Sequence, residues 1–172
     1  LTGGTRTALA RQRTLEATVE WSYNLLSKTE RRLFCRLSSF AGGWTLEAAE
    51  EVCSGGAIKK TQMLDLLSQL VDKSLVSVED TAIGERRYRF LETVRQYGRE
   101  RLLRSGEAGR IRDLHFDFFL ALAQRAEPEL IRASQAEWLT RLQFDHDNLR
   151  LALDWSLVQP NVGDRGLALA AA

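Results

Sequence analysis

The chain has 172 residues, of which 44% are hydrophobic and 27% are charged, and its formal net charge is +1. This composition is typical of a globular protein with one generous domain or two small ones. The small net charge excludes nucleic-acid binding through bulk charge alone. No apolar run approaches the roughly 18–20 residues that cross a bilayer, and no signal peptide is visible. We therefore expect a cytoplasmic protein without a membrane partner.

The first elements are a linker and a helix. Residues 1–13 combine Gly and Thr with basic residues, show no stable period, and are interpreted as a linker. A helical period follows, which predicts a buried helix face. This face contains Leu15, Val19, Ser22 and Leu26, widened by Trp21 and Leu25.

The second and third helices carry recognisable start signals. Ser27 and Glu30 have the spacing of a capping box, in which each side chain satisfies a free backbone N–H group. The helix that begins there is expected to bury Leu33, Phe34, Leu37 and Phe40. Gly42 and Gly43 end it, and Thr45 is a candidate N-cap for a helix over residues 46–52.

A helix over about residues 61–73 and two short strands come next. Met63, Leu64, Leu67, Leu70 and Val71 form the apolar stripe of the helix. Residues 75–78 and 87–90 alternate as strands do, with a polar turn around Gly84 between them. Alternation predicts Tyr88 and Phe90 in the core and Arg87 and Arg89 in solvent. Three helices followed by a hairpin is the order of a winged helix, which a helix over about residues 92–103 would complete.

The remaining chain is predicted to be helical. Ser105 and Gly106 form a plausible helix end, and their small neighbours indicate a joint over residues 105–109 with little to bury. The helical period then resumes, Pro128 and Pro160 interrupt it, and a further helix starts near Asp164. We predict a mainly α fold: a winged-helix domain at residues 14–105 and antiparallel helices that open a repeat array at residues 106–172.

Residues that could carry catalysis or bind metal are sparse. The sequence has no G-x-x-x-x-G-K-[ST] loop for a triphosphate, so we expect no enzyme activity and no cofactor in this chain. Cys35 and Cys53 are interpreted as buried apolar residues, and His115 as a core histidine. His146 lies in the segment Asp-His-Asp-Asn. Adjacent helical residues diverge, so we predict a structural role for this segment and no metal site.

DNA binding is the alternative that any winged helix raises. Residues 61–73 would be the recognition helix, with Lys59 and Lys60 ahead of it, but Asp65 and Asp72 on it would repel phosphate. The wing offers Arg86, Arg87 and Arg89 beside Glu79, Asp80 and Glu85. These arginines could protect an edge strand from aggregation, dock on an acidic surface of another module, or contact DNA. Residues 6–36 also hold a local basic excess, made of Arg6, Arg11, Arg13, Lys28, Arg31, Arg32 and Arg36 against Glu16, Glu20 and Glu30.

Three blocks in fixed order carry a family resemblance: residues 11–53, 67–80 and 87–102. Together they resemble the winged-helix region of bacterial STAND-type regulatory ATPases, the NB-ARC relatives found in large LuxR-family and SARP-like transcriptional regulators. The resemblance implies that an ATPase module binding ATP or ADP lies outside this chain, and that the helices after residue 105 begin a TPR-like array. It also implies that the winged helix docks on that module, and that the array binds an inducer or a protein partner.

The resemblance also suggests a place for nucleotide sensing. Many NB-ARC proteins begin the helix after the wing with Met-His-Asp, and the matching residues here are Phe90, Leu91 and Glu92. A leucine cannot donate a hydrogen bond to phosphate. Any reading of nucleotide state at this place would therefore use packing or an arginine such as Arg95, which with Glu92 is a weak nucleotide-sensing candidate.

Overall fold

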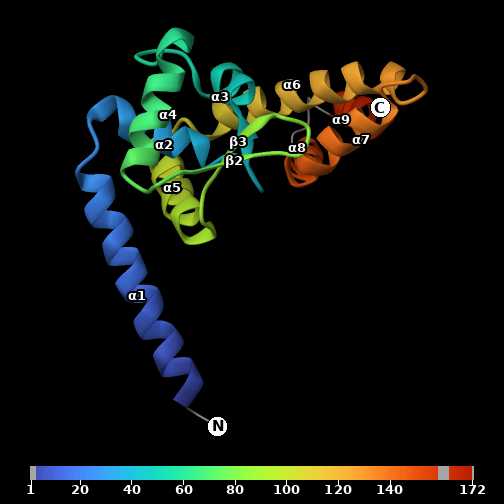
Figure 1. Cartoon of the computed structure of the whole chain (residues 1–172). Helices are drawn as coiled ribbons and strands as arrows, with labels where there is room; N and C mark the ends of the chain where they lie inside the picture. The colour runs from blue at the N-terminus through green and yellow to red at the C-terminus, as the bar shows by residue number, and fades with distance from the viewer. Residues whose placement is uncertain (1–2, 159–162, 172) are drawn as a thin grey trace.

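The structure is a computed structural model that describes residues 3–158 and 163–171, so the predicted break at Pro160 lies outside the described residues. Helices dominate, and a small sheet accompanies the first half of the chain (Figure 1). The elements in chain order are α1 (Gly3–Asn24), α2 (Lys28–Leu37), β1 (Trp44–Thr45), α3 (Leu46–Cys53), η1 (Lys60–Gln62), α4 (Met63–Asp72), β2 (Ser77–Asp80), β3 (Arg86–Arg89), α5 (Glu92–Arg104), α6 (Ala108–Ala126), η2 (Glu127–Glu129), α7 (Gln135–Phe144), α8 (His146–Val158) and α9 (Gly163–Ala171).

The predicted hairpin is confirmed and belongs to a larger sheet. β2 and β3 pair antiparallel, with Val78 opposite Tyr88. β1 adds to the other side of β3, with Trp44 opposite Tyr88, so the strand order is β1-β3-β2. β3 is therefore the central strand of the sheet and not an edge strand. A two-residue strand is too short to show alternation, which is why the pattern missed β1.

The capping signals act as predicted. The Ser27 hydroxyl accepts a hydrogen bond from Glu30 N at 3.3 Å, and the Glu30 carboxylate accepts one from Ser27 N at 2.7 Å. Lys73, at the end of α4, also donates to Glu30. Burial acts to raise the pKa of Glu30, but the hydrogen bonds from Lys73 and Ser27 outweigh it and lower that pKa below its ordinary value. Thr45 caps α3 by accepting from Ala48 N at 3.1 Å.

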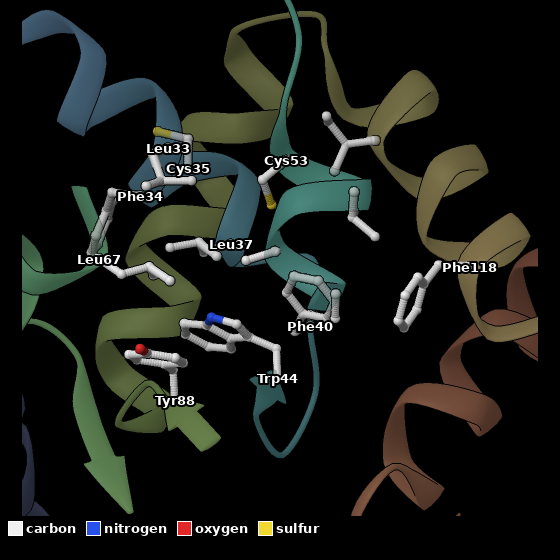
Figure 2. Close-up of a cluster of buried hydrophobic side chains, with 14 of the residues drawn as sticks. Leu33, Phe34, Cys35, Leu37, Phe40, Trp44, Cys53, Leu67, Tyr88 and Phe118 are labelled. Carbon is white, nitrogen blue, oxygen red and sulfur yellow. The ribbon is translucent and has the colours of Figure 1, made fainter. Parts of the chain in front are cut away.

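One continuous core joins both halves of the chain. Leu33, Phe34 and Leu37 of α2 lie beside Leu67 of α4 and the aromatic pair Trp44 and Tyr88, while Phe118 of α6 approaches the same cluster (Figure 2). Cys35 and Cys53 are buried within it, as predicted. α6 packs on α3 and α8 packs on α6, so the helices after residue 105 cover the first half of the chain. Their assignment to a repeat array stays a prediction.

Two glycines permit close approaches inside this core. Gly98 of α5 lies so near α2 that an added Cβ would be 3.0 Å from Ser38 Cβ and 3.2 Å from Phe34 Cε1. Gly43 has φ of +134°, and a Cβ there would be 2.9 Å from the carbonyl oxygen of Tyr88. Side chains at either position would push α5 off α2 or the loop off β3.

Helix α1 departs from the sequence prediction in two ways. It begins at Gly3, so most of the predicted linker is helical. Alanine and arginine are good helix formers, which favours a helix over this segment. Only the end of α1 reaches the body of the molecule (Figure 1), where Val19 is buried. Val19 and Leu26 are buried as predicted, whereas Trp21 is 66% exposed and Leu15 and Leu25 are exposed too, so the buried face is narrower than predicted.

The segment between α5 and α6 is fastened more firmly than predicted. Arg36 of α2 is 2% exposed and binds both carboxylate oxygens of Glu107, at 2.9 and 3.0 Å. The same guanidinium group donates to the carbonyl oxygens of Cys53 and Gly55, at 2.8 and 3.0 Å. Ala108 is buried as well. The prediction that residues 105–109 have little to bury holds for the exposed Ser105, Gly106 and Gly109 and is wrong for Glu107 and Ala108, while a domain boundary near residue 105 stays a prediction.

Replacing Leu67 with Ala should lower the free energy of unfolding by about 2–5 kcal/mol, because Leu67 is fully buried in α4. Leu64→Ala is the matched control on the same helix, since that side chain is about half exposed. Chemical denaturation followed by circular dichroism measures both. Equal losses in the two variants would show that the buried face of α4 is wrongly assigned.

Candidate nucleic-acid interface

The outer face of α4 is the surface that a DNA reader would present. Its exposed residues include Gln62, Ser68 and Gln69, which could contact bases, but also Asp65 and Asp72. No lysine or arginine lies within α4 itself. DNA binding depends on cationic side chains that neutralise phosphates. The helix face therefore carries a net negative charge where a DNA-binding helix needs a positive one.

The lysines beside α4 are largely engaged. Lys60 binds Glu51 of α3 at 2.6 Å, and Lys73 binds the buried carboxylate of Glu30. Lys59 is exposed and has no ion pair within the described part of the chain. One lysine is a small electrostatic contribution compared with the several phosphate contacts of a typical DNA-binding domain.

The exposed wing arginines are matched by carboxylates across the hairpin. Arg86 binds Asp80 at 3.1 Å, and Arg89 binds Glu79 at 3.2 Å. Arg86 lies directly opposite Asp80 in the register, whereas Glu79 lies opposite Arg87, so the Arg89–Glu79 pair is a diagonal one between β2 and β3. All four side chains are exposed, so the pairs can open at little cost. The wing nevertheless presents nearly neutral charge.

Arg87 is not an exposed wing residue, contrary to the sequence prediction. The alternation with Tyr88 holds, but the α7–α8 junction covers the face of β3 that carries Arg87, and Arg87 is 7% exposed. Its guanidinium group binds Asp145 at 2.5 and 3.3 Å and lies over the Phe144 ring at 5.6 Å. Arg87 is therefore a buried ion-pair partner, so it cannot contact DNA or another surface without breaking this packing.

Asp145 belongs to a buried polar network centred on Asn148. The Asn148 amide group donates to Gly43 O at 2.8 Å and to Asp145 at 3.2 Å, while its carbonyl oxygen accepts from Ala41 N at 2.7 Å. His115 Nε2 lies 3.4 Å from the same oxygen and must be the donor, because a carbonyl oxygen only accepts. The structural role predicted for Asp-His-Asp-Asn is confirmed for Asp145 and Asn148, whereas His146 is exposed.

The nucleotide-sensing candidates bind each other. Arg95 donates to both carboxylate oxygens of Glu92, at 2.7 and 2.8 Å, across one turn of α5. The hydrogen bond from Arg95 lowers the pKa of Glu92, against the opposing effect of burial. Leu91, in the place of the family's histidine, is exposed at the start of the helix. The positive charge of Arg95 is therefore partly neutralised by Glu92.

Two further kinds of site are absent from the described residues. No group of three or more His, Cys, Asp or Glu side chains there could hold a metal ion. None of the described helices is both long and apolar enough to pass through a lipid bilayer.

Comparison with known proteins decides how the first half of the chain is classified. Residues 26–103 match the family described as "Winged helix-turn-helix domain". The matched segment contains α2, α3, α4, the β2–β3 wing and nearly all of α5. These residues have a winged-helix fold and are similar to that family. α4 occupies the recognition-helix position of this domain, and β2 and β3 form its wing.

Longer proteins resemble most of the chain. Proteins named "Putative HTH-type transcriptional regulator" in Mycobacterium tuberculosis and Mycobacterium bovis are 44% identical over 156 residues, which is 91% of this chain and 17% of theirs. An uncharacterized protein of Mycobacterium tuberculosis is 44% identical over 107 residues, covering 62% of this chain and 27% of its own. The chain thus spans only a small part of these relatives. No solved structure matches it.

Arg87→Gln should destabilise the protein by about 3–5 kcal/mol, because it leaves the buried Asp145 carboxylate without its cation. Arg89→Gln, two residues along the same strand, removes only an exposed pair and should cost about 1 kcal/mol or less. Urea denaturation at one pH compares the two. Similar small losses would mean that the Arg87–Asp145 pair contributes little.

Stability should fall as pH drops from about 7 to about 5, in part because of His115. Burial lowers the pKa of His115 from 6.5 to about 4, despite the hydrogen bond to Asn148. The unfolded chain therefore takes up a proton that the folded chain refuses, which costs about 2 kcal/mol of stability over this range. Urea denaturation at each pH should show a flatter slope for His115→Gln and an unchanged slope for the exposed control His146→Gln. Equal slopes in all three proteins would contradict this account.

Proposed function

We propose that this chain is the coupling module of a transcriptional regulator, in which the winged helix-turn-helix domain and the helices after it move as one body. In the complete protein, the module would carry the nucleotide state of an ATP- or ADP-binding ATPase module to the helices after residue 105. The winged helix would act by docking on protein, not by gripping DNA.

The observation that carries this proposal is the pair of buried ion pairs across residue 105. Arg36–Glu107 and Arg87–Asp145 each join the winged helix to a later helix, and in each the arginine is almost fully buried. Separating the partners of either pair would leave a buried charge without its counter-charge, which costs several kcal/mol. A displacement of the winged helix would therefore displace α6 and α8 with it.

The charge distribution supports docking on protein. The α4 face is acidic, and the wing cations are paired with their own carboxylates. Exposed apolar side chains in α1 and directly after it offer an alternative surface: Trp21, Leu15 and Leu25. Exposed tryptophans are frequent anchors in protein interfaces. The resemblance to NB-ARC regulators supports the ATPase module as the partner that covers α1.

A second candidate function, direct DNA binding, is favoured by a specific observation. The matched domain is of the winged helix-turn-helix type, and the relatives' names describe HTH-type transcriptional regulators. The wing pairs Arg86–Asp80 and Arg89–Glu79 are exposed and could exchange their carboxylates for phosphates. This route would use the wing more than α4.

The two functions differ in salt dependence. We expect random duplex DNA to bind this chain weakly, without the steep loss of affinity with salt that marks phosphate contacts. Fluorescence anisotropy of labelled duplex at two salt concentrations measures this. The double variant Arg86→Gln, Arg89→Gln should bind as weakly as the parent. Micromolar or tighter binding that weakens steeply with salt, and that the double variant loses, would establish the DNA-binding function instead.

In the complete protein, Trp21→Ala should raise basal ADP release if α1 packs on the ATPase module. The reason is that removing a central aromatic anchor weakens the resting interface, commonly by 2 kcal/mol or more. Release of a fluorescent ADP analogue measures the effect. Ile131→Ala is the control, because Ile131 is 90% exposed and lies far along the chain, after α6. Unchanged ADP release in Trp21→Ala would remove this docking surface.

A further inference from the structure

A cavity of about 280 Å³ lies between the winged helix and the helices that follow it. Ser38 and Ser39 after α2 contribute to its lining, together with side chains of α5, α6 and α8. The buried side chains of Leu102 and His115 form apolar parts of the wall, since His115 is neutral at pH 7. Its size suits a compact organic molecule.

Three arginines gather at this cavity: Arg95, Arg99 and Arg112. Arg95 is bound to Glu92, but neither Arg99 nor Arg112 forms an ion pair with any carboxylate in the described chain. Desolvation, together with the nearby charge of Arg99, lowers the pKa of Arg112. Two unpaired guanidinium groups close enough to repel each other would be stabilised by an anion between them.

The cavity also has a fixed aromatic side. Trp155 of α8 lines it, and the Arg112 guanidinium group lies over the Trp155 ring at 5.0 Å. The indole N–H donates to Asp113 at 2.9 Å, which holds the ring in place. Asp154 is the one carboxylate among the residues that line this cavity in the described structure. Cationic and apolar groups therefore line one space, in which Asp154 is the opposing charge, while Glu92 lies outside the lining and acts on Arg95 and Arg99.

We propose that this cavity binds a small organic anion with a flat apolar body, such as an aromatic carboxylate. The acid group pairs with Arg99 and Arg112, and the apolar body packs against Trp155 and Leu102. Because the lining comes from both sides of residue 105, the bound anion adds a further link between the winged helix and α8. The site does not depend on what the winged helix docks on.

The test uses 1-naphthoate as the probe, with isothermal titration calorimetry of the intact chain. We expect saturable binding with one site per chain. 1-Naphthalenemethanol has the same rings without the charge, and acetate has the charge without the rings. Each should bind about tenfold more weakly or worse. Absence of saturable binding by 1-naphthoate, or equal binding of 1-naphthalenemethanol, would overturn the proposal.

Variants locate the site and give effects of opposite sign. Arg99→Gln and Arg112→Gln should each weaken 1-naphthoate binding about tenfold, whereas Asp154→Asn should strengthen it about two- to fivefold. Arg104→Gln is the control on the same helix as Arg99, because Arg104 is exposed and does not line the cavity. Thermal melts check folding, and if Arg112→Gln fails to fold, the exposed positions Arg99 and Asp154 decide. Unchanged affinity in Arg99→Gln and Asp154→Asn would overturn the assignment.

Discussion

The packing of this molecule depends on the bonds that join Arg87, Asp145 and Asn148. Arg87 lies on the central strand of the sheet, Asp145 and Asn148 lie at the start of α8, and Asn148 has no exposed surface. A buried carboxylate and a buried amide are costly unless all their hydrogen bonds form together. The network therefore fixes three segments at once: the wing, the loop over residues 41–43 and the α7–α8 junction. The cavity beside His115 owes its walls to the same arrangement.

Much of the local structure was predictable because its signals lie within a few residues of each other. The capping box of α2, the apolar stripe of α4 and the alternation of β3 each need only short-range rules. The Glu92–Arg95 pair could also have been found this way, because the two residues are one helical turn apart. Helix α1 shows the limit. The helical spacing places Trp21 and Leu25 on the predicted apolar face, but spacing does not reveal whether another element covers that face.

The burial of two basic residues could not be predicted from the sequence for a different reason. Counting charges identified Arg36 and Arg87 as basic residues, yet their partners are Glu107 and Asp145, 71 and 58 positions further along the chain. No local pattern links such residues, and only the fold brings them together. The cavity with Arg99 and Arg112 is equally non-local, since its lining comes from four separate segments. The charge that the surface presents is therefore known only when the fold shows which basic residues are buried in ion pairs.

The core shared between α3 and α6 has a consequence for how such proteins are inherited. A recombination breakpoint after residue 105 would separate Arg36 from Glu107 and uncover the apolar side chains of α6, Phe119 among them. Each recombinant protein would have an exposed apolar surface without its packing partner and would be prone to aggregation and proteolysis. Gene shuffling should therefore transfer the winged helix together with its following helices. The segment that is transferred intact should then extend well beyond residue 103, where the match to the domain family ends.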